Sequence, residues 1–137
     1  NRDELDDFAA CKFTRKEDWV DLYAKPYYFG CEADDRMNAT AFSKGIPFGA
    51  QLNAIYSSDI GHFDVIDFRD PLPEAYELVE DEHITEANFR DFVFANSVRL
   101  WGKQNPAFFA GTAVAKEAAA LLKATYGSSP AMQDAAK

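Results

Sequence analysis

The apolar residues of this chain fall into short runs that predict two buried strands among helices. The first run is aromatic and covers Tyr27–Cys31, and the second covers Leu52–Tyr56. Uncharged apolar runs of this length are typical of parallel strands that are buried on both faces. Asp35 is placed to cap a helix between them that extends to about Ser43. A strand, a helix and a second strand form a unit in which we expect the two strands to be adjacent and parallel.

Helical periodicity before this unit predicts two further helices. The first is a short helix over Asp3–Ala10, where apolar residues lie on one side among acids. The second begins at Thr14, which we interpret as the N-cap of a capping box closed by Glu17. Its apolar face starts at Trp19, and Pro26 ends it, because the residue before a proline disfavours helical backbone angles.

After the second strand the pattern predicts three helices. The first covers residues 71–81. The second is capped by Thr85 and closed by Gly102, and the third is an alanine-rich stretch over residues 113–126. In the middle helix, Asn96 is placed to hold a neighbouring loop through side-chain bonds. The residues predicted to face the core are Met37, Ala41 and Phe42 in the first connecting helix, Ala75, Leu78 and Val79 after the second strand, and Phe89, Phe92, Phe94 and Trp101 in the helix that follows.

Charge and composition exclude several classes of partner. The chain has 137 residues, of which 47% are hydrophobic and 15% aromatic, as in a globular domain. Its net charge of −9 repels phosphate backbones and anionic lipid, so we expect no nucleic-acid or membrane partner. Cys11 and Cys31 match no metal or disulfide spacing, which favours a reducing, cytoplasmic location. The tail from residue 127 to 137 is small and polar, and we expect it to be flexible.

Ionisable residues gather where each predicted strand ends. Glu32 follows the first strand, and Asp59 and His62 follow the second. The carboxyl ends of parallel strands are where α/β enzymes place their chemistry, so these three residues are candidate site residues. Asp59 could instead be a helix cap or a turn former, and His62 a loop histidine bonded to backbone. Asp64 and Asp67 fit turn positions better than ligand positions.

Three motifs in order carry a family resemblance, and they span about Tyr27 to Thr112. They are GCEADD, SSDIGHFDV and DFVFANSVRLWGKQNPAFFAGT. Together they resemble the carboxyl-terminal part of metal-dependent amidohydrolases, in the branch that includes aminocarboxymuconate-semialdehyde decarboxylase. The resemblance implies an α/β fold, in which residues 1–126 form the last part of a TIM (β/α)8 barrel. It also implies a cytoplasmic hydrolase or decarboxylase of a small molecule.

The resemblance further implies that Asp59 is a metal ligand and the catalytic proton acceptor. In that superfamily a divalent metal, zinc by default, is held by histidines from earlier strands and by the aspartate after the last strand. His62 and Glu32 would then lie near the substrate. Glu32 could bind a cationic or hydroxylated substrate group, or could simply be solvated. Pairing Glu32 with Asp59 as a glycosidase would need a motif that this chain does not contain.

This chain departs from the family pattern in its histidines. It has two, His62 and His83, and no His-x-His pair. A complete TIM barrel needs roughly 250 residues, so we interpret the chain, which begins at Asn1, as a carboxyl-terminal piece. One carboxylate does not hold catalytic zinc, which normally has three protein ligands, so we expect no metal on the isolated chain. The alternative interpretation is a non-catalytic helical fragment that self-associates as a homo-oligomer through exposed strand edges and apolar faces.

Overall fold

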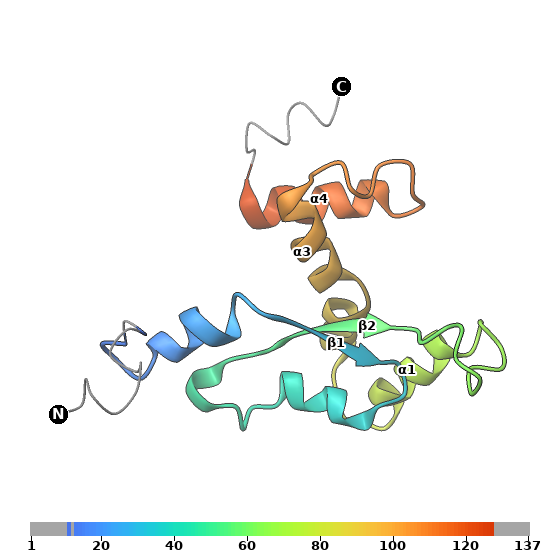
Figure 1. Ribbon diagram of the computed structural model, residues 1–137, viewed down its shortest axis with the longest axis horizontal. Helices are drawn as coiled ribbons and strands as arrows, with labels where there is room; N and C mark the ends of the chain where they lie inside the picture. The colour runs from blue at the N-terminus through green and yellow to red at the C-terminus, as the bar shows by residue number, and fades with distance from the viewer. Residues whose placement is uncertain (1–10, 12, 128–137) are drawn as a thin grey trace.

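A computed structural model describes residues 11 and 13–127 and contains a small parallel sheet with helices around it (Figure 1). β1 (Tyr28–Glu32) pairs with β2 (Asn53–Ser57), and Tyr28 lies opposite Asn53 in the register. The predicted parallel pair is therefore confirmed, with each strand shifted by one residue. The helix predicted over residues 3–10 and the tail over residues 128–137 lie outside the described residues.

The connection between the strands is a tight helix rather than an α-helix. η4 (Arg36–Phe42) is a 3₁₀-helix, and the carboxylate of Asp35 caps it by accepting a bond from the Met37 N–H at 2.8 Å. The prediction that Asp35 is an N-cap is confirmed. The prediction that Met37 faces inward is wrong, because Met37 is 70% exposed while Ala41 is buried. With three residues per turn instead of 3.6, a 3₁₀-helix turns a different set of side chains toward the core.

The segments after β2 are helical over most of their length. Thr85 caps the middle one in a capping box with Asn88, which confirms the predicted N-cap. That helix continues through three successive segments and ends two residues beyond the predicted end at Gly102. The remaining elements are η3 (Val20–Ala24), η5 (Pro47–Gly49), α1 (Pro71–Glu80), α2 (Glu86–Arg90), the π-helix η6 (Asp91–Ala95), α3 (Asn96–Gln104) and α4 (Ala115–Tyr126).

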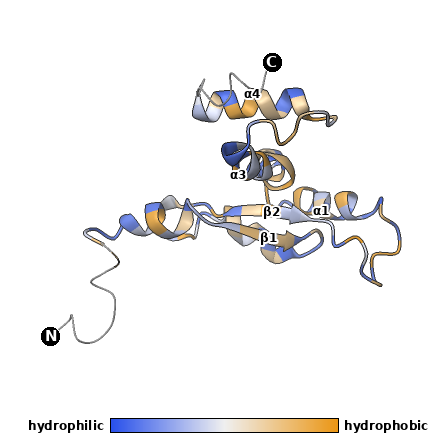
Figure 2. Ribbon diagram, turned by 45° about the horizontal axis from the view of Figure 1, so that its top comes forward, coloured by the Kyte–Doolittle hydropathy of each residue, from blue (hydrophilic) through white to orange (hydrophobic). Residues whose placement is uncertain are grey.

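The buried apolar side chains form two separate clusters. The first lies between the sheet, α1 and η6, and Phe92 is its largest fully buried member. The second lies where α3 packs on α4, and there Gly102 lets Leu122 approach the α3 backbone. Figure 2 shows α3 and α4 stacked on the β2 side of the sheet, with β1 on the far side. The first cluster comprises Ala33, Ala41, Ala54, Ala75, Leu78, Ile84 and Phe92, and the second comprises Val98, Ala118 and Leu122.

A buried side-chain amide joins the helical half to the sheet. Asn96 donates from Nδ2 to the backbone oxygen of Ala54 at 2.9 Å, and its Oδ1 accepts a bond from Arg99 at 3.0 Å. Arg99 also contacts Asp91 at 3.0 Å. The prediction for Asn96 is corrected in one respect. Its partner is a strand and not a loop.

The aromatic residues of the helical half do not all belong to the core. Trp101 was predicted to be buried but is 47% exposed, and it stacks on Phe108 with ring centroids 5.6 Å apart. The partner of this ring is therefore another partly exposed aromatic residue and not the core. Among the described residues, no helix is both long and apolar enough to cross a bilayer.

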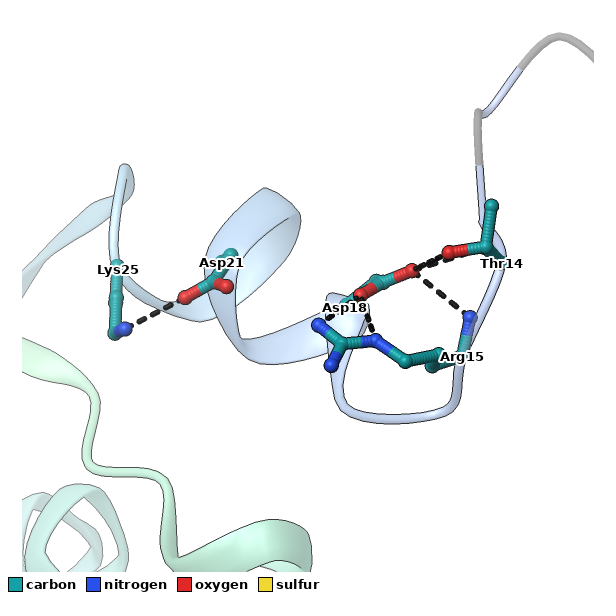
Figure 3. Close-up of polar contacts among 5 residues, drawn as sticks. All are labelled: Thr14, Arg15, Asp18, Asp21 and Lys25. Carbon is teal, nitrogen blue, oxygen red and sulfur yellow. Dashed lines mark hydrogen bonds and ion pairs between the residues drawn. The ribbon is translucent and has the colours of Figure 1, made fainter.

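The N-terminal helical segment begins at a cap built by Asp18 (Figure 3). The Asp18 carboxylate accepts bonds from the Thr14 N–H at 2.9 Å, the Thr14 hydroxyl at 2.8 Å and the Arg15 N–H at 2.8 Å. The predicted partner of Thr14 was Glu17, and this prediction is wrong by one residue. The Asp18 carboxylate, four residues after Thr14, reaches both N–H groups across a turn that the Asp18 N–H closes by donating to the Arg15 carbonyl at 3.2 Å.

Lowering the pH should release this cap only in strongly acidic solution. The bonds from the Thr14 and Arg15 N–H groups hold the pKa of Asp18 well below its ordinary value of 3.8. A depressed pKa means that the cap stabilises the folded chain above the ordinary carboxyl pKa and that this contribution is lost as the pH falls toward the lowered value. The Thr14 amide resonance, followed by NMR, should therefore show no inflection near pH 3.8. Asp18→Asn should shift that resonance at neutral pH, whereas Asp21→Asn should leave it in place.

Candidate active site at the strand ends

A cavity of about 250 Å³ opens at the carboxyl ends of β1 and β2. The predicted strand-end residues Glu32 and Asp59 both line it, one from each strand. The parallel pairing brings them together, because the carboxyl ends of adjacent parallel strands meet at one edge of the sheet. The other residues that line the cavity are Ala33, Asp34, Ser58, Asp64, Val65, Ile66, Asp67, Asp70 and Glu74.

Asp59 is held by the turn that follows β2. Its backbone has a positive φ of 53°, which aspartate tolerates better than most residues, and the His62 N–H donates to the Asp59 carbonyl at 3.2 Å. The turn places the His62 ring beside the Asp59 carboxylate, with Nδ1 2.6 Å from Oδ2. Gly61, with a φ of 113°, supplies the backbone angle that this tight turn needs. The interpretation of Asp59 as a turn former is therefore correct for its backbone, while its side chain contacts the histidine.

Asp64 joins this pair, although the sequence indicated only a turn residue. One ligand atom each from Asp59, His62 and Asp64 lies within 4.8 Å of the others. An imidazole nitrogen with two carboxylate oxygens is a donor set that divalent zinc or manganese accepts. The signal for Asp64 in the sequence was its spacing of five residues from Asp59 across a glycine turn.

The neighbouring acids have structural partners. Asp67 forms an ion pair with Arg69 and accepts its backbone N–H at 2.9 Å, as predicted for a turn residue. The bonds from Arg69 lower the pKa of the Asp67 carboxyl. The carbonyl of Glu32 accepts a bond from Asn38 at 2.6 Å, which fixes the end of β1 beside the cavity. His83 is exposed between α1 and α2 and does not line this cavity.

The loop beside the cavity carries large apolar side chains that are exposed in the part of the chain that the structure describes. Phe63 is 97% exposed and Ile66 95%, and Ile60 and Phe68 are also mostly exposed. The sequence does not mark these residues as special, because a loop residue between two glycine or aspartate turns belongs to no periodic pattern. Of these four residues, Ile66 lines the cavity.

No protein-family model, curated protein or solved structure matches this chain.

Proposed function

We propose that this chain supplies the metal-binding and proton-accepting part of a metal-dependent hydrolase or decarboxylase related to the amidohydrolases. The observation that carries the proposal is the Asp59–His62 contact of 2.6 Å at the strand ends, with Asp64 in reach of both. In this proposal β1 and β2 correspond to the last two strands of a TIM (β/α)8 barrel. The substrate is a small molecule with a C–N or C–O bond to hydrolyse, or a carboxylate to release.

Each residue has a separate role in this proposal. Asp59, His62 and Asp64 would hold the ion, because together they provide one nitrogen donor and two oxygen donors. When bound, a divalent ion polarises a substrate oxygen and lowers the pKa of a bound water to about 7. Asp59 has two carboxylate oxygens, so one remains to accept a proton from the attacking water. Glu32, at the end of β1, faces the same cavity and would bind a cationic or hydroxylated group of the substrate.

Titration of the purified chain with Zn²⁺ and Mn²⁺, followed by calorimetry, tests the metal site directly. With His62 and Asp64 beside Asp59 the chain has three candidate ligands, so we expect one ion per chain, in place of the absence of metal that we expected from the sequence. Asp59→Asn keeps the shape of the side chain but removes its charge, and it should weaken binding by at least about tenfold. Asp67→Asn is the matched control, because Asp67 lines the same cavity but is held by Arg69. It should change the affinity by less than about twofold, since the Arg69 contact already neutralises its charge.

Two results would contradict this site. One is a wild-type chain that binds neither ion at millimolar concentration. The other is an equal loss of affinity in Asp59→Asn and Asp67→Asn, which would indicate nonspecific attraction to the acidic cavity. If the chain binds the ion as expected, its turnover of amide and carboxylic-acid substrates separates hydrolysis from decarboxylation.

The second candidate function is a non-catalytic domain that associates with other chains. The exposed apolar side chains of Ile60, Phe63, Ile66 and Phe68 support it, since clustered apolar exposure is typical of interaction surfaces. This candidate predicts oligomers that form equally well with and without added metal. The metal-dependent proposal predicts that Asp59→Asn weakens ion binding by at least about tenfold without changing the oligomeric state.

A further inference from the structure

A second cavity, which we call the basal groove, lies at the opposite end of the strands from the candidate active site. Its volume is about 400 Å³. Trp19 and Tyr23 line it from the side of η3, and Ile46, Phe48 and Leu52 line it from the η5 turn and the residues that lead into β2. Figure 1 shows both segments at the amino ends of the strands, whereas α1 lies at their carboxyl ends.

The walls of the basal groove are apolar and largely uncovered. None of the nine residues that line it is charged. Trp19 is 46% exposed, Tyr23 39% and Phe48 50%. Phe48 also has a φ of 63°, a backbone angle that is strained for a bulky side chain and persists only where other contacts hold it. An apolar groove of this size with aromatic walls is typical of a surface that another apolar group covers.

Two lysines lie next to these walls in the sequence. Lys16 precedes Trp19 by three residues, and Lys44 precedes Ile46 by two. Both lysines are exposed, and neither forms an ion pair with any residue in the part of the chain that the structure describes. A group that covers the groove therefore fits best if it combines an apolar face with acidic residues beside it.

Residues 3–10 of this chain have that composition. Leu5, Phe8 and Ala9 recur at the three- and four-residue spacing of one helix face. The acids among them are Asp3, Glu4, Asp6 and Asp7. These residues lie outside the part of the chain that the structure describes, so their position relative to the groove has to come from the residues that follow them.

The residues that follow keep the chain at the wall of the groove. The Cys11 and Tyr23 side chains share a hydrogen bond. The Phe13 ring lies 4.6 Å from the Trp19 ring and 5.4 Å from the Tyr23 ring, measured between centroids. Residues 3–10 are therefore tethered beside the groove, and a tethered segment has a high effective concentration at a neighbouring surface. Eight helical residues span about 12 Å, so such a helix stays close to its tether.

We propose that residues 3–10 form a helix that covers the basal groove, with Leu5 and Phe8 against its aromatic walls. The acids on the remaining faces of this helix then lie near Lys16 and Lys44. The cover leaves both edges of the sheet free, as the proposed barrel requires. It also involves none of the strand-end carboxylates, so it does not depend on the proposed metal site.

Acrylamide quenching of tryptophan fluorescence tests this cover, because the two tryptophans of the chain have nearly equal exposure. Trp19 in the groove is 46% exposed, and Trp101 on α3 is 47% exposed. Trp101→Phe leaves Trp19 as the only tryptophan, and Trp19→Phe leaves Trp101. If residues 3–10 cover the groove, the quenching constant of Trp19 should be at least about twofold smaller than that of Trp101, since the indole ring is buried on one more side.

Substitutions within residues 3–10 identify which face makes the contact. In the chain that keeps only Trp19, Phe8→Asp places a charge against the apolar groove and should raise the quenching constant to the value for Trp101. Leu5→Asp should have the same effect. Ala10→Asp is the matched control, because it adds the same charge on the opposite side of the predicted helix. It should leave the quenching of Trp19 unchanged.

Either of two results would overturn the proposal. One is quenching of Trp19 as efficient as that of Trp101 in the chain without a charge substitution, which would leave the groove open to a different occupant. The other is an equal effect of Phe8→Asp and Ala10→Asp, which would show that added charge, and not the loss of an apolar contact, changes the quenching. Both measurements are made without metal, so they separate this proposal from the proposed function.

Discussion

Replacing Phe92 with alanine should destabilise the folded chain by about 3–5 kcal/mol, the cost of removing a fully buried aromatic ring. Phe92 is 0% exposed and is the largest fully buried side chain of the described residues. It contacts the sheet edge-to-face through Tyr56, with ring centroids 5.9 Å apart. Native domains are stable by only about 5–15 kcal/mol, so this one substitution removes a large share of the total.

Urea unfolding followed by circular dichroism measures this loss as a lower midpoint at an unchanged slope. Phe63→Ala is the matched control. It deletes the same ring from a position that is 97% exposed, and it should change stability by less than about 0.5 kcal/mol. Equal effects of the two substitutions would mean that Phe92 does not organise the packing of η6 on the sheet.

Replacing Asn96 with alanine should destabilise the chain by about 1–3 kcal/mol. The substitution leaves the buried Ala54 carbonyl without its donor, and an unpaired buried acceptor loses its solvation without any compensating bond. It also removes an acceptor of Arg99, whose contact with Asp91 remains. The loss should appear in the same urea experiment.

Asn96→Asp separates the two contacts of this residue. An ionised aspartate has nearly the same shape and still accepts from Arg99, but it has no N–H to donate to Ala54 and places a charge beside that carbonyl. We expect it to be at least as destabilising as alanine. A stable Asn96→Asp variant would show that the Arg99 contact, and not the bond to the strand, makes the main contribution.

Local signals in the sequence were enough to predict much of the fold. The parallel pair followed from two apolar runs joined by a short connection, and the caps at Asp35 and Thr85 followed from residue type. The errors had different origins. Thr14 is bonded to Asp18 instead of Glu17, and Trp101 stacks on Phe108 from an ordinary α-helix. The tighter 3₁₀ turn of η4, unlike an α-helix of 3.6 residues per turn, exposed Met37. Apolar spacing does not distinguish these helix types.

The candidate site was predicted in part. Glu32, Asp59 and His62 were identified because they follow strands, and the structure places the first two on one cavity and the last two in contact. Asp64 was interpreted as a turn residue instead of a ligand, because the backbone path of the Gly61 turn decides where its side chain lies. The sequence predicted only that the Asn96 side chain bonds to a neighbouring loop, because a strand 42 residues away gives no local signal.

The two buried clusters share one continuous run of helix, and this arrangement affects how the chain opens. Phe92 anchors the run in the first cluster and Val98 anchors it in the second, only six residues later. The second cluster is small and involves α3, α4, the turn between them and Phe94 of η6, so α4 can detach at a lower free energy than the sheet. The protection of backbone amides from exchange should therefore differ between the two ends of this helical run. Protection should be highest near Phe92 and should fall toward Gly102, so that fraying of α4 leaves the strand ends and their carboxylates undisturbed.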